Sequence, residues 1–218
     1  MNKSISFGLI GLLVVVIIAG IASQPFDAAA AGTTIVSDSF TRNVRDSWGN
    51  APTGGTYSLS GGAANFDVPD VVGQMNLGKN TTLTASLPVS ARDVDVKVRV
   101  KRNKGIAGGN QMAYFAVRRT ATGTNYLGRI RFVTDGTVRL QAIAEVGGTQ
   151  TMLGGEKIVS GVTTAANSYI WLRGQVTGAN PTTVKLKAWA QGASEPSSWL
   201  YTITDSTAAL QGAGGAGL

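Results

Sequence analysis

Residues 93–101 read DVDVKVRVK, in which valine alternates strictly with charged residues. Successive side chains of an extended chain point to opposite sides, which would put the four valines on one face and the charged residues on the other. The pattern therefore predicts a strand with one buried and one solvated face, as in an antiparallel sheet. The positive charge extends further along the chain, because eleven Lys or Arg stand against three acids between Arg92 and Arg139.

The composition favours a single all-β domain and excludes several kinds of catalytic site. Glycine is abundant, with 29 residues, and apolar residues at helical spacing are scarce, which is typical of short strands joined by tight turns. Cysteine and histidine are both absent, which rules out disulfides, thiolate or imidazole metal ligands, and Ser-His-Asp catalysis. The net charge of +7 indicates either attraction to polyanions, such as acidic glycans, or only a means of staying soluble.

The first 31 residues have the order of a secretory signal. Lys3 precedes an apolar run at 5–22, and Pro25 is followed by the small residues 28–31. The apolar run has 18 residues, which is also long enough for a helix that stays in the bilayer. We therefore expect residues 1–31 to be a signal peptide or an N-terminal anchor helix, residues 32–218 to be the folded domain, and the protein to be secreted or held at the cell surface.

From Thr34 onward, short extended runs alternate with joins that contain glycine, proline, Asn or Asp. About a dozen short strands at this spacing predict an antiparallel sandwich or a barrel. The expected strands are 35–40, 57–59, 65–68, 74–77, 83–87, 93–101, 112–118, 126–133, 137–146, 151–153, 169–176, 184–190 and 199–204.

Matching the apolar faces of neighbouring strands fixes the register of a first hairpin, between 126–133 and 137–146. A two-residue turn at Asp135-Gly136 would mix apolar and charged faces across the pair. A three-residue loop at 134–136 instead sets Phe132 opposite Val138 and keeps both faces consistent. The sequence therefore predicts the longer loop, with Gly136 in the left-handed conformation that such loops require.

The same register places arginines opposite one another on the charged face of this hairpin. Arg131 would lie directly across from Arg139, with Arg129 two residues along the same face. Like charges in facing positions destabilise a sheet unless an anion or an acid lies between them. We therefore take these three arginines as candidate residues for binding an anionic ligand.

A second hairpin, between 169–176 and 184–190, brings aromatic rings and cations together. Its apolar faces match when Val176 lies opposite Val184. The other face then pairs Trp171 with Trp189, Arg173 with Lys187, and Gln175 with Lys185. Sugar rings stack on indole and their acidic substituents pair with Arg or Lys, so this face could form a sugar-binding groove. Alternatively, both tryptophans lie between the sheets and the cations extend from the rim.

Several short pieces of sequence occur in an order that resembles a known family. With them, residues 35–218 resemble the LamG-like jelly-roll modules of the concanavalin A-like lectin/glucanase superfamily, which occur in secreted bacterial and archaeal surface proteins. The resemblance implies a jelly-roll β-sandwich that binds carbohydrate or mediates adhesion. The pieces are Asp38-Ser39-Phe40-Thr41-Arg42, Trp48-Gly49, Thr53-Gly54-Gly55-Thr56-Tyr57, Phe66 with Val68, Gly73-Gln74-Met75-Asn76-Leu77, Asp135-Gly136-Thr137-Val138-Arg139-Leu140, Gly178-Ala179-Asn180-Pro181-Thr182-Thr183, Lys187-Ala188-Trp189, Glu195-Pro196 with Trp199, and Thr204-Asp205.

The glutamates depart from the pattern of the glucanases in this superfamily. Those enzymes carry catalytic carboxylates close together on one strand, in a Glu-x-Asp-x-x-Glu type of run. The only glutamates here are Glu145, Glu156 and Glu195, and none is followed two residues later by Asp. Retaining glycosidases need two carboxyl groups about 5 Å apart, so the sequence argues against a glycoside hydrolase.

The C-terminal end departs from the family as well. Related modules continue past the position of Leu218 into a further strand beside the first one, so we expect the domain 32–218 to lack its final strand.

The run Gly212–Gly217 formally fits a dinucleotide-binding glycine pattern. It lacks the surrounding strand-then-helix unit, and we expect it to be a turn.

Cofactors and partners follow from the same observations. We expect no cofactor other than a structural Ca²⁺, which Asp38 and Asp205 could hold, as carboxylates do in many jelly rolls. The expected partner is a polysaccharide or glycoconjugate, either neutral or anionic. Nucleic acid is not expected, since no recognition motif is present, and a membrane would be contacted only through an uncleaved leader. The sequence therefore predicts a non-catalytic carbohydrate-binding or adhesive module, with a purely structural surface module as the alternative.

Overall fold

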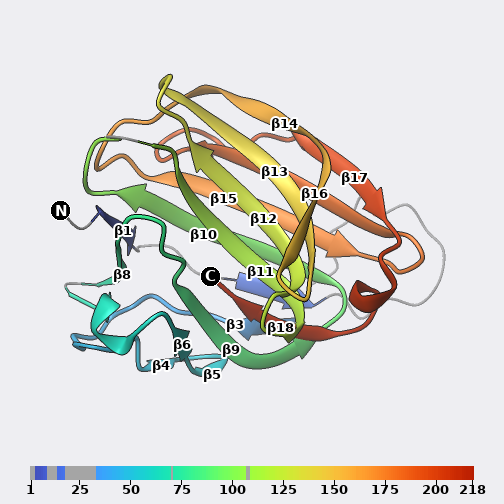
Figure 1. Ribbon diagram of the computed structural model, residues 1–218, viewed down its shortest axis with the longest axis horizontal. Coiled ribbons are helices and arrows are strands. Elements are labelled where there is room, and N and C mark those ends of the chain that lie inside the picture. The colour runs from blue at the N-terminus through green and yellow to red at the C-terminus, as the bar shows by residue number, and fades with distance from the viewer. Residues whose placement is uncertain (1–2, 9–13, 18–32, 70, 107–108) are drawn as a thin grey trace.

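The computed structural model describes residues 3–8, 14–17, 33–69, 71–106 and 109–218. Within these residues the chain is all-β, with antiparallel pairing throughout the two large sheets and no α-helix. The sheets pack face to face, as in a β-sandwich, and β12 and β13 cross over β10, β15 and β16 in the view of Figure 1. The expected all-β, antiparallel architecture is therefore confirmed.

Each large sheet combines strands from distant parts of the chain. The first contains, in order, β17 (Tyr201–Asp205), β16 (Thr182–Ala190), β15 (Ile170–Thr177), β10 (Val94–Arg102), β1 (Lys3–Gly8), β8 (Val72–Leu77) and β7 (Phe66–Asp67), with β2 (Val14–Ile17) beside β10 and β3 (Thr33–Val36) beside β2. The second contains β14 (Thr149–Thr163), β13 (Thr137–Val146), β12 (Thr124–Phe132), β11 (Gln111–Ala121), β18 (Gly214–Gly217), β9 (Thr84–Ala91) and β6 (Ser58–Ser60). Smaller elements are the pair β4 (Asn50–Ala51) and β5 (Gly55–Thr56), and the 3₁₀ turns η1 (Ala63–Asn65) and η2 (Ala208–Leu210).

The expected N-terminal helix is not shown. Of the leader, the structure describes only β1 and β2, and the other residues of 1–31 lie outside the described part of the chain. Within the described ranges, no helix has the length and hydrophobicity needed to cross a bilayer.

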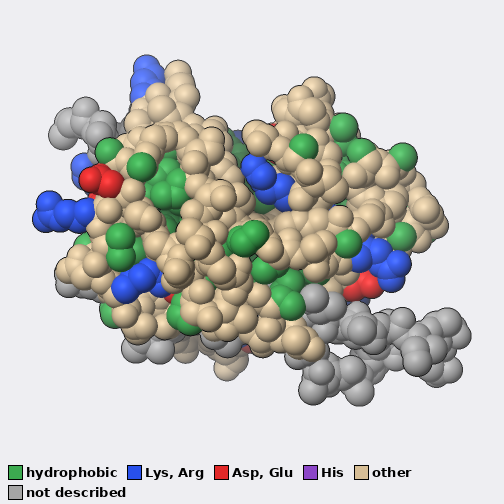
Figure 2. Space-filling model, turned by 90° about the horizontal axis from the view of Figure 1, so that it is seen from below, with side chains coloured by type: hydrophobic (Ala, Val, Ile, Leu, Met, Phe, Trp, Pro, Cys, Tyr) green, Lys and Arg blue, Asp and Glu red, His purple; other side chains and the backbone are tan. Residues whose placement is uncertain are grey.

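Strand β10 has the two faces that its alternating sequence predicts. All four of its valines are buried in the core between the sheets, while Lys97 and Lys101 are partly exposed on the outer side. The neighbouring strands follow the same rule, with Leu172 of β15 and Leu186 of β16 fully buried. On the surface seen from below Figure 1, hydrophobic side chains lie in small, separate groups among polar ones (Figure 2). The large apolar side chains are thus mostly collected in one core.

Both predicted hairpin registers are confirmed. In the first hairpin Phe132 pairs with Val138 across a three-residue loop, and Gly136 has a φ of +89°. In the second, Val176 pairs with Val184, as the matching of apolar faces predicts. Hairpins are local structures, so the alternation of residues on either side of a short loop suffices to set their register.

Two glycines on different sheets make room for one aromatic ring in the core. Phe115 of β11 is almost fully buried. A Cβ atom on Gly128 of the adjacent strand β12 would lie 2.2 Å from this ring, and one on Gly174 of β15 would lie equally close. Glycine inside a strand often marks such a close approach. The ring of Phe115 therefore fixes how β11 sits against the opposite sheet.

A cluster of aromatic side chains packs around Trp48 in the core. The indole of Trp48 meets Phe40, Tyr57 and Phe66 edge-on, with ring centroids 5.2, 5.3 and 5.8 Å away. Edge-to-face contacts of this kind are favourable because the positive edge of one ring meets the negative face of another. The indole Nε1 also donates a hydrogen bond of 3.0 Å to the carbonyl oxygen of Gln74. These contacts tie the irregular segment 37–49 to β7 and β8.

Two regions differ from the sequence-based expectation. The glycine-rich run at the C-terminus is not a turn, because Gly214–Gly217 forms β18 between β11 and β9. A Cβ on Gly214 would lie 2.4 Å from the backbone of Arg118, so glycine lets the backbones approach. Strand β14 is also much longer than the expected 151–153, with register shifts where it pairs with β13. The expectation that the domain lacks a final strand stays a prediction.

Candidate binding face

The outer side of β10, β15 and β16 collects most of the chain's excess positive charge. Six of its side chains are cationic and two are acidic, a difference of four against a net +7 for the whole chain. Tyr169, Trp171, Trp189 and Trp199 lie among these charges. We call this surface the basic aromatic face; its charged members are Lys97, Arg99, Lys101, Arg173, Lys185, Lys187, Asp95 and Glu195.

Cross-strand pairing arranges these residues in rows. The register of β10, β15 and β16 aligns Lys97 with Arg173 and Lys187 in one row. The next row aligns Arg99 with Trp171 and Trp189, and the one on the other side aligns Asp95 with Gln175 and Lys185. Since residues directly opposite on one face of a sheet are close enough to interact, each row is a set of neighbours.

The two tryptophans lie on this outer face, so the alternative that places them between the sheets is wrong. Trp171 and Trp189 stack with ring centroids 6.2 Å apart and planes inclined by 20°. The Nζ atom of Lys97 lies 5.0 Å from the centre of each ring. Their orientation follows from strand alternation, because residues such as Leu172 already occupy the inner face.

The two tryptophans nevertheless differ in exposure. Trp171 is partly exposed, whereas Trp189 is only 5 % exposed although it faces away from the core. The segment 191–200, which joins β16 to β17, carries the groups that contact this region. The carbonyl oxygen of Pro196 accepts a 2.7 Å hydrogen bond from Lys187, and the ring of Trp199 lies 4.7 Å from the same Nζ. This segment therefore lies over part of the face.

Acids are placed between the cations. Glu195 accepts hydrogen bonds from Lys97 (2.9 Å), Arg173 (2.5 Å) and Lys187, whose Nζ lies 2.8 Å away. Burial alone would raise the pKa of Glu195, but the hydrogen bonds from these three cations outweigh it and hold the pKa at about 2. Asp95 binds Arg173 through both carboxylate oxygens, at 2.8 and 2.6 Å. Its hydrogen bonds are the main cause of a raised pKa for Arg173.

One end of the face adjoins a cavity. The guanidinium of Arg99 lies 4.1 Å from the ring centre of Tyr169, and the Nζ of Lys101 lies 4.7 Å from it. Arg99 also donates a 3.1 Å hydrogen bond to Gln191. The cavity beside Tyr169 has a volume of about 390 Å³ and is lined by 161–163, 167–170 and 190–191. Cations and an aromatic ring therefore lie next to an open space.

The three candidate arginines of the first hairpin form a separate cluster on the second sheet. Arg131 does lie opposite Arg139, and the acid that separates like charges is Glu156 of β14. Glu156 pairs with Arg129 at 2.8 Å and with Arg131, while Asp135 pairs with Arg139 at 2.6 Å. The eight candidate binding residues thus fall into two groups on different sheets. In this second group the protein's own acids lie against the arginines.

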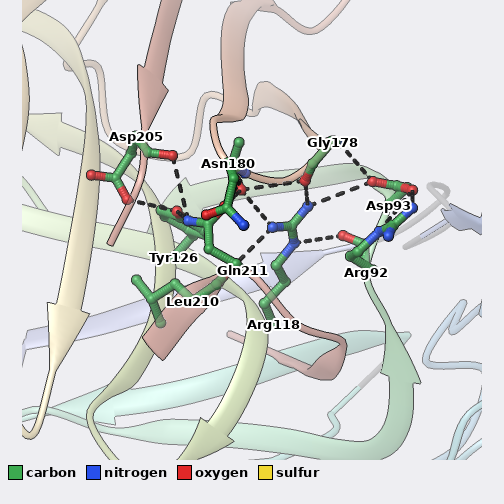
Figure 3. A network of polar contacts seen from close by, with 10 residues as sticks. Arg92, Asp93, Arg118, Tyr126, Gly178, Asn180, Asp205, Leu210 and Gln211 are labelled. Atoms are coloured by element: carbon green, nitrogen blue, oxygen red, sulfur yellow. Dashed lines mark hydrogen bonds and ion pairs between the residues drawn. The ribbon is translucent and has the colours of Figure 1, made fainter. Parts of the chain in front are cut away.

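The two carboxylates considered for calcium are held by protein donors. Asp38 is fully buried and binds the guanidinium of Arg42 through both oxygens, at 2.8 and 2.7 Å. Asp205 accepts a 2.6 Å hydrogen bond from Tyr126 (Figure 3). It accepts another, of 2.9 Å, from the backbone N–H of Thr207. Among the described residues, no group of three or more acidic side chains is arranged to hold a metal ion. A structural Ca²⁺ at these positions stays a prediction.

Sequence reasoning missed part of the basic aromatic face. It identified Trp171, Trp189 and the cations of the second hairpin, but it did not join β10 or the segment 191–200 to them.

Comparison with models of protein families, with curated proteins and with solved structures finds no match for the chain. The geometry of the face is therefore the main ground for a functional proposal.

Proposed function

We propose that the protein is a non-catalytic, LamG-like jelly-roll module that binds an anionic polysaccharide or glycoconjugate on the basic aromatic face. The observation that carries this proposal is the gathering of three tryptophans, one tyrosine and six cations on the outer side of three adjacent strands. Aromatic rings offer flat surfaces on which sugar rings stack, and Arg and Lys pair with carboxylates or sulfates. A local excess of positive charge also attracts polyanions over a distance.

Several groups on the face are accessible to a ligand. The side chains of Lys97 and Arg173 are 35 % and 31 % exposed, and Trp171 and Trp199 are also partly exposed. Strands β10 and β15 hold Lys97, Trp171 and Arg173 at fixed separations, which limits the ordering that binding must impose. The face could therefore contact several sugar units of an extended polymer at once.

The state of the acids on this face supports a non-catalytic role. A general acid must carry a proton near the working pH, and Glu195, with a pKa of about 2, is ionised at neutral pH. Asp95 is engaged by Arg173 and Gln175 through hydrogen bonds of 2.6 to 2.8 Å. Glu195 is therefore unsuited to protonating a glycosidic oxygen, and the carboxylate of Asp95 is already held by protein donors.

A purely structural surface module is the second candidate. The near-complete burial of Trp189 and Lys187, and the ion pairs of Glu195, favour it, because they show that the face is partly filled by its own side chains. In either case the proposal includes export, with residues 1–31 acting as a signal peptide or as an anchor helix. The two candidates differ in whether substitutions on the face change binding to an acidic glycan.

Binding of polygalacturonate should depend on the basic aromatic face and not on charge elsewhere. We expect Trp171→Ala to weaken binding by about 3- to 10-fold through loss of stacking. Lys185→Glu should weaken it by several-fold because it reverses one charge on the face. Lys157→Glu makes the same charge change at an exposed position of β14, on the other sheet, and should leave the affinity unchanged. Titration calorimetry of the four chains measures these differences.

Two results would contradict the proposal. Equal losses for Lys185→Glu and Lys157→Glu would show that only net charge matters. Full retention of affinity in Trp171→Ala and Lys185→Glu would place the ligand elsewhere, and the structural candidate would then be preferred for this face.

A further inference from the structure

Glu195 lies at the centre of a row of three cations. Lys97, Arg173 and Lys187 come from three adjacent strands, and all three contact its carboxylate at 2.5 to 2.9 Å. The acid itself belongs to no strand, because it lies in the segment 191–200 between β16 and β17. A row of cations on three strands is thus partly neutralised by an acid on a connecting segment.

The segment that carries Glu195 also restricts access to the face. Lys187 is only 5 % exposed, and its Nζ contacts Glu195, the carbonyl oxygen of Pro196 and the ring of Trp199, all from this segment. The carboxylate of Glu195 is nevertheless reachable, since its side chain is 25 % exposed beside the more exposed Lys97. Solvent, and a ligand, can therefore approach the row from the side of Lys97 and Arg173.

The ion pairs in this row allow the carboxylate of Glu195 to be replaced by that of a ligand. The pairs of Glu195 with Lys97 and Arg173 are partly exposed on both sides, and such pairs contribute little net stability because water solvates the separated charges nearly as well. Replacing one carboxylate by another therefore costs little. The row also keeps a positive excess, since three cations face two acids when Asp95 is included. An acidic ligand would be attracted even before Glu195 moves.

We infer that Glu195 occupies the position taken by an acidic group of the bound glycan, most closely a uronate carboxylate. On binding, the ligand's carboxylate replaces that of Glu195 among Lys97, Arg173 and Lys187. The adjoining sugar ring then lies against Trp171 or Trp199, which flank this row. This inference rests on the proposed function and assigns the ligand class: glycans that carry a carboxylate directly on a pyranose ring.

The substitution Glu195→Gln tests the inference, because it removes the competing charge and keeps the size of the side chain. We expect trigalacturonate to bind this variant about tenfold more tightly than the unsubstituted chain. The fully methyl-esterified trisaccharide is neutral and should bind both chains equally. Glu156→Gln is a matched control, since Glu156 also lies among three arginines but on the other sheet. It should leave both affinities unchanged.

The outcomes separate this inference from the proposed function. If the unsubstituted chain binds trigalacturonate and Glu195→Gln binds it equally or more weakly, Glu195 does not occupy the position of the ligand's carboxylate, although the face still binds glycan. If neither chain binds, both proposals fail. Thermal unfolding shows whether each variant is folded. Should Glu195→Gln not fold, Glu195→Asp keeps the charge on a shorter side chain, and the absence of any gain in affinity there would overturn the inference.

Discussion

Replacing Arg118 by methionine should lower the free energy of unfolding by about 3–5 kcal/mol, the usual loss when one partner of a buried ionic network is removed. Arg118 is fully buried, and its guanidinium joins three turns that are distant in sequence (Figure 3). Methionine fills similar space but donates no hydrogen bond, so four acceptors, two of them buried, would lose a donor. The acceptors are the carbonyl oxygens of Arg92 (2.6 Å), Gly178 (2.7 Å) and Leu210 (3.1 Å), and the hydroxyl of Thr182 (2.7 Å).

The adjacent residue gives a matched control for this substitution. Arg119 is partly exposed, and its side chain donates a 3.3 Å hydrogen bond to Thr122. Arg119→Met should therefore change stability by no more than about 0.5 kcal/mol. Equilibrium unfolding in urea measures both variants. Equal stability of the two would mean that the buried network around Arg118 does not hold the three turns together.

Truncation of Trp48 to alanine should cost a similar amount, about 3–5 kcal/mol, which is typical for removing a large buried aromatic side chain. The indole is fully buried and touches the rings of Phe40, Tyr57 and Phe66, so its removal leaves a cavity that rigid neighbours cannot fill. The hydrogen bond from Nε1 to Gln74 would also be lost.

The variant Trp48→Phe separates packing from hydrogen bonding at this position. It keeps most of the aromatic contacts and loses the Nε1 donor, so we expect a loss smaller than that of Trp48→Ala in the same urea experiment. If Trp48→Ala unfolded at the same urea concentration as the unsubstituted chain, the aromatic cluster would not be part of the cooperative core.

Local features of this fold could be predicted from the sequence because neighbouring residues decide them. The alternation in 93–101 gives the two faces of β10, and face matching gives the registers of the β12–β13 and β15–β16 hairpins. In each case one wrong step of register would put charged residues in the core. The free-energy cost of burying those charges is large enough to leave a single register for each hairpin.

Contacts between distant segments could not be predicted in this way. Lys97 pairs with Arg173, but the two strands are separated by four others in the chain, and alternation does not indicate which strands become neighbours. Glu195 lies in a connecting segment with no periodic pattern, so nothing in the sequence placed it among the cations. The glycines of β18 form a strand only because neighbouring backbones approach closely there, as at Gly214.

The same limitation applied to the candidate site. Periodicity puts Trp171 and Trp189 on one face of their hairpin, but it does not say whether that face lies inside or outside the sandwich. The opposite face carries Leu172, Val176 and other aliphatic residues, which pack better in a core than cations do. Only the second sheet, with Phe115 seated against Gly174, fixes which face is inward.

The central claim is that the basic aromatic face binds an acidic glycan, and the dependence of binding on salt tests it most directly. Raising the ionic strength from about 50 to 500 mM shortens the range of electrostatic attraction to a few ångströms. Calorimetric titration of the 218-residue chain with polygalacturonate should therefore show an affinity that falls at least about tenfold over this range. An affinity that does not change with salt, or no binding at about 50 mM, would contradict the account.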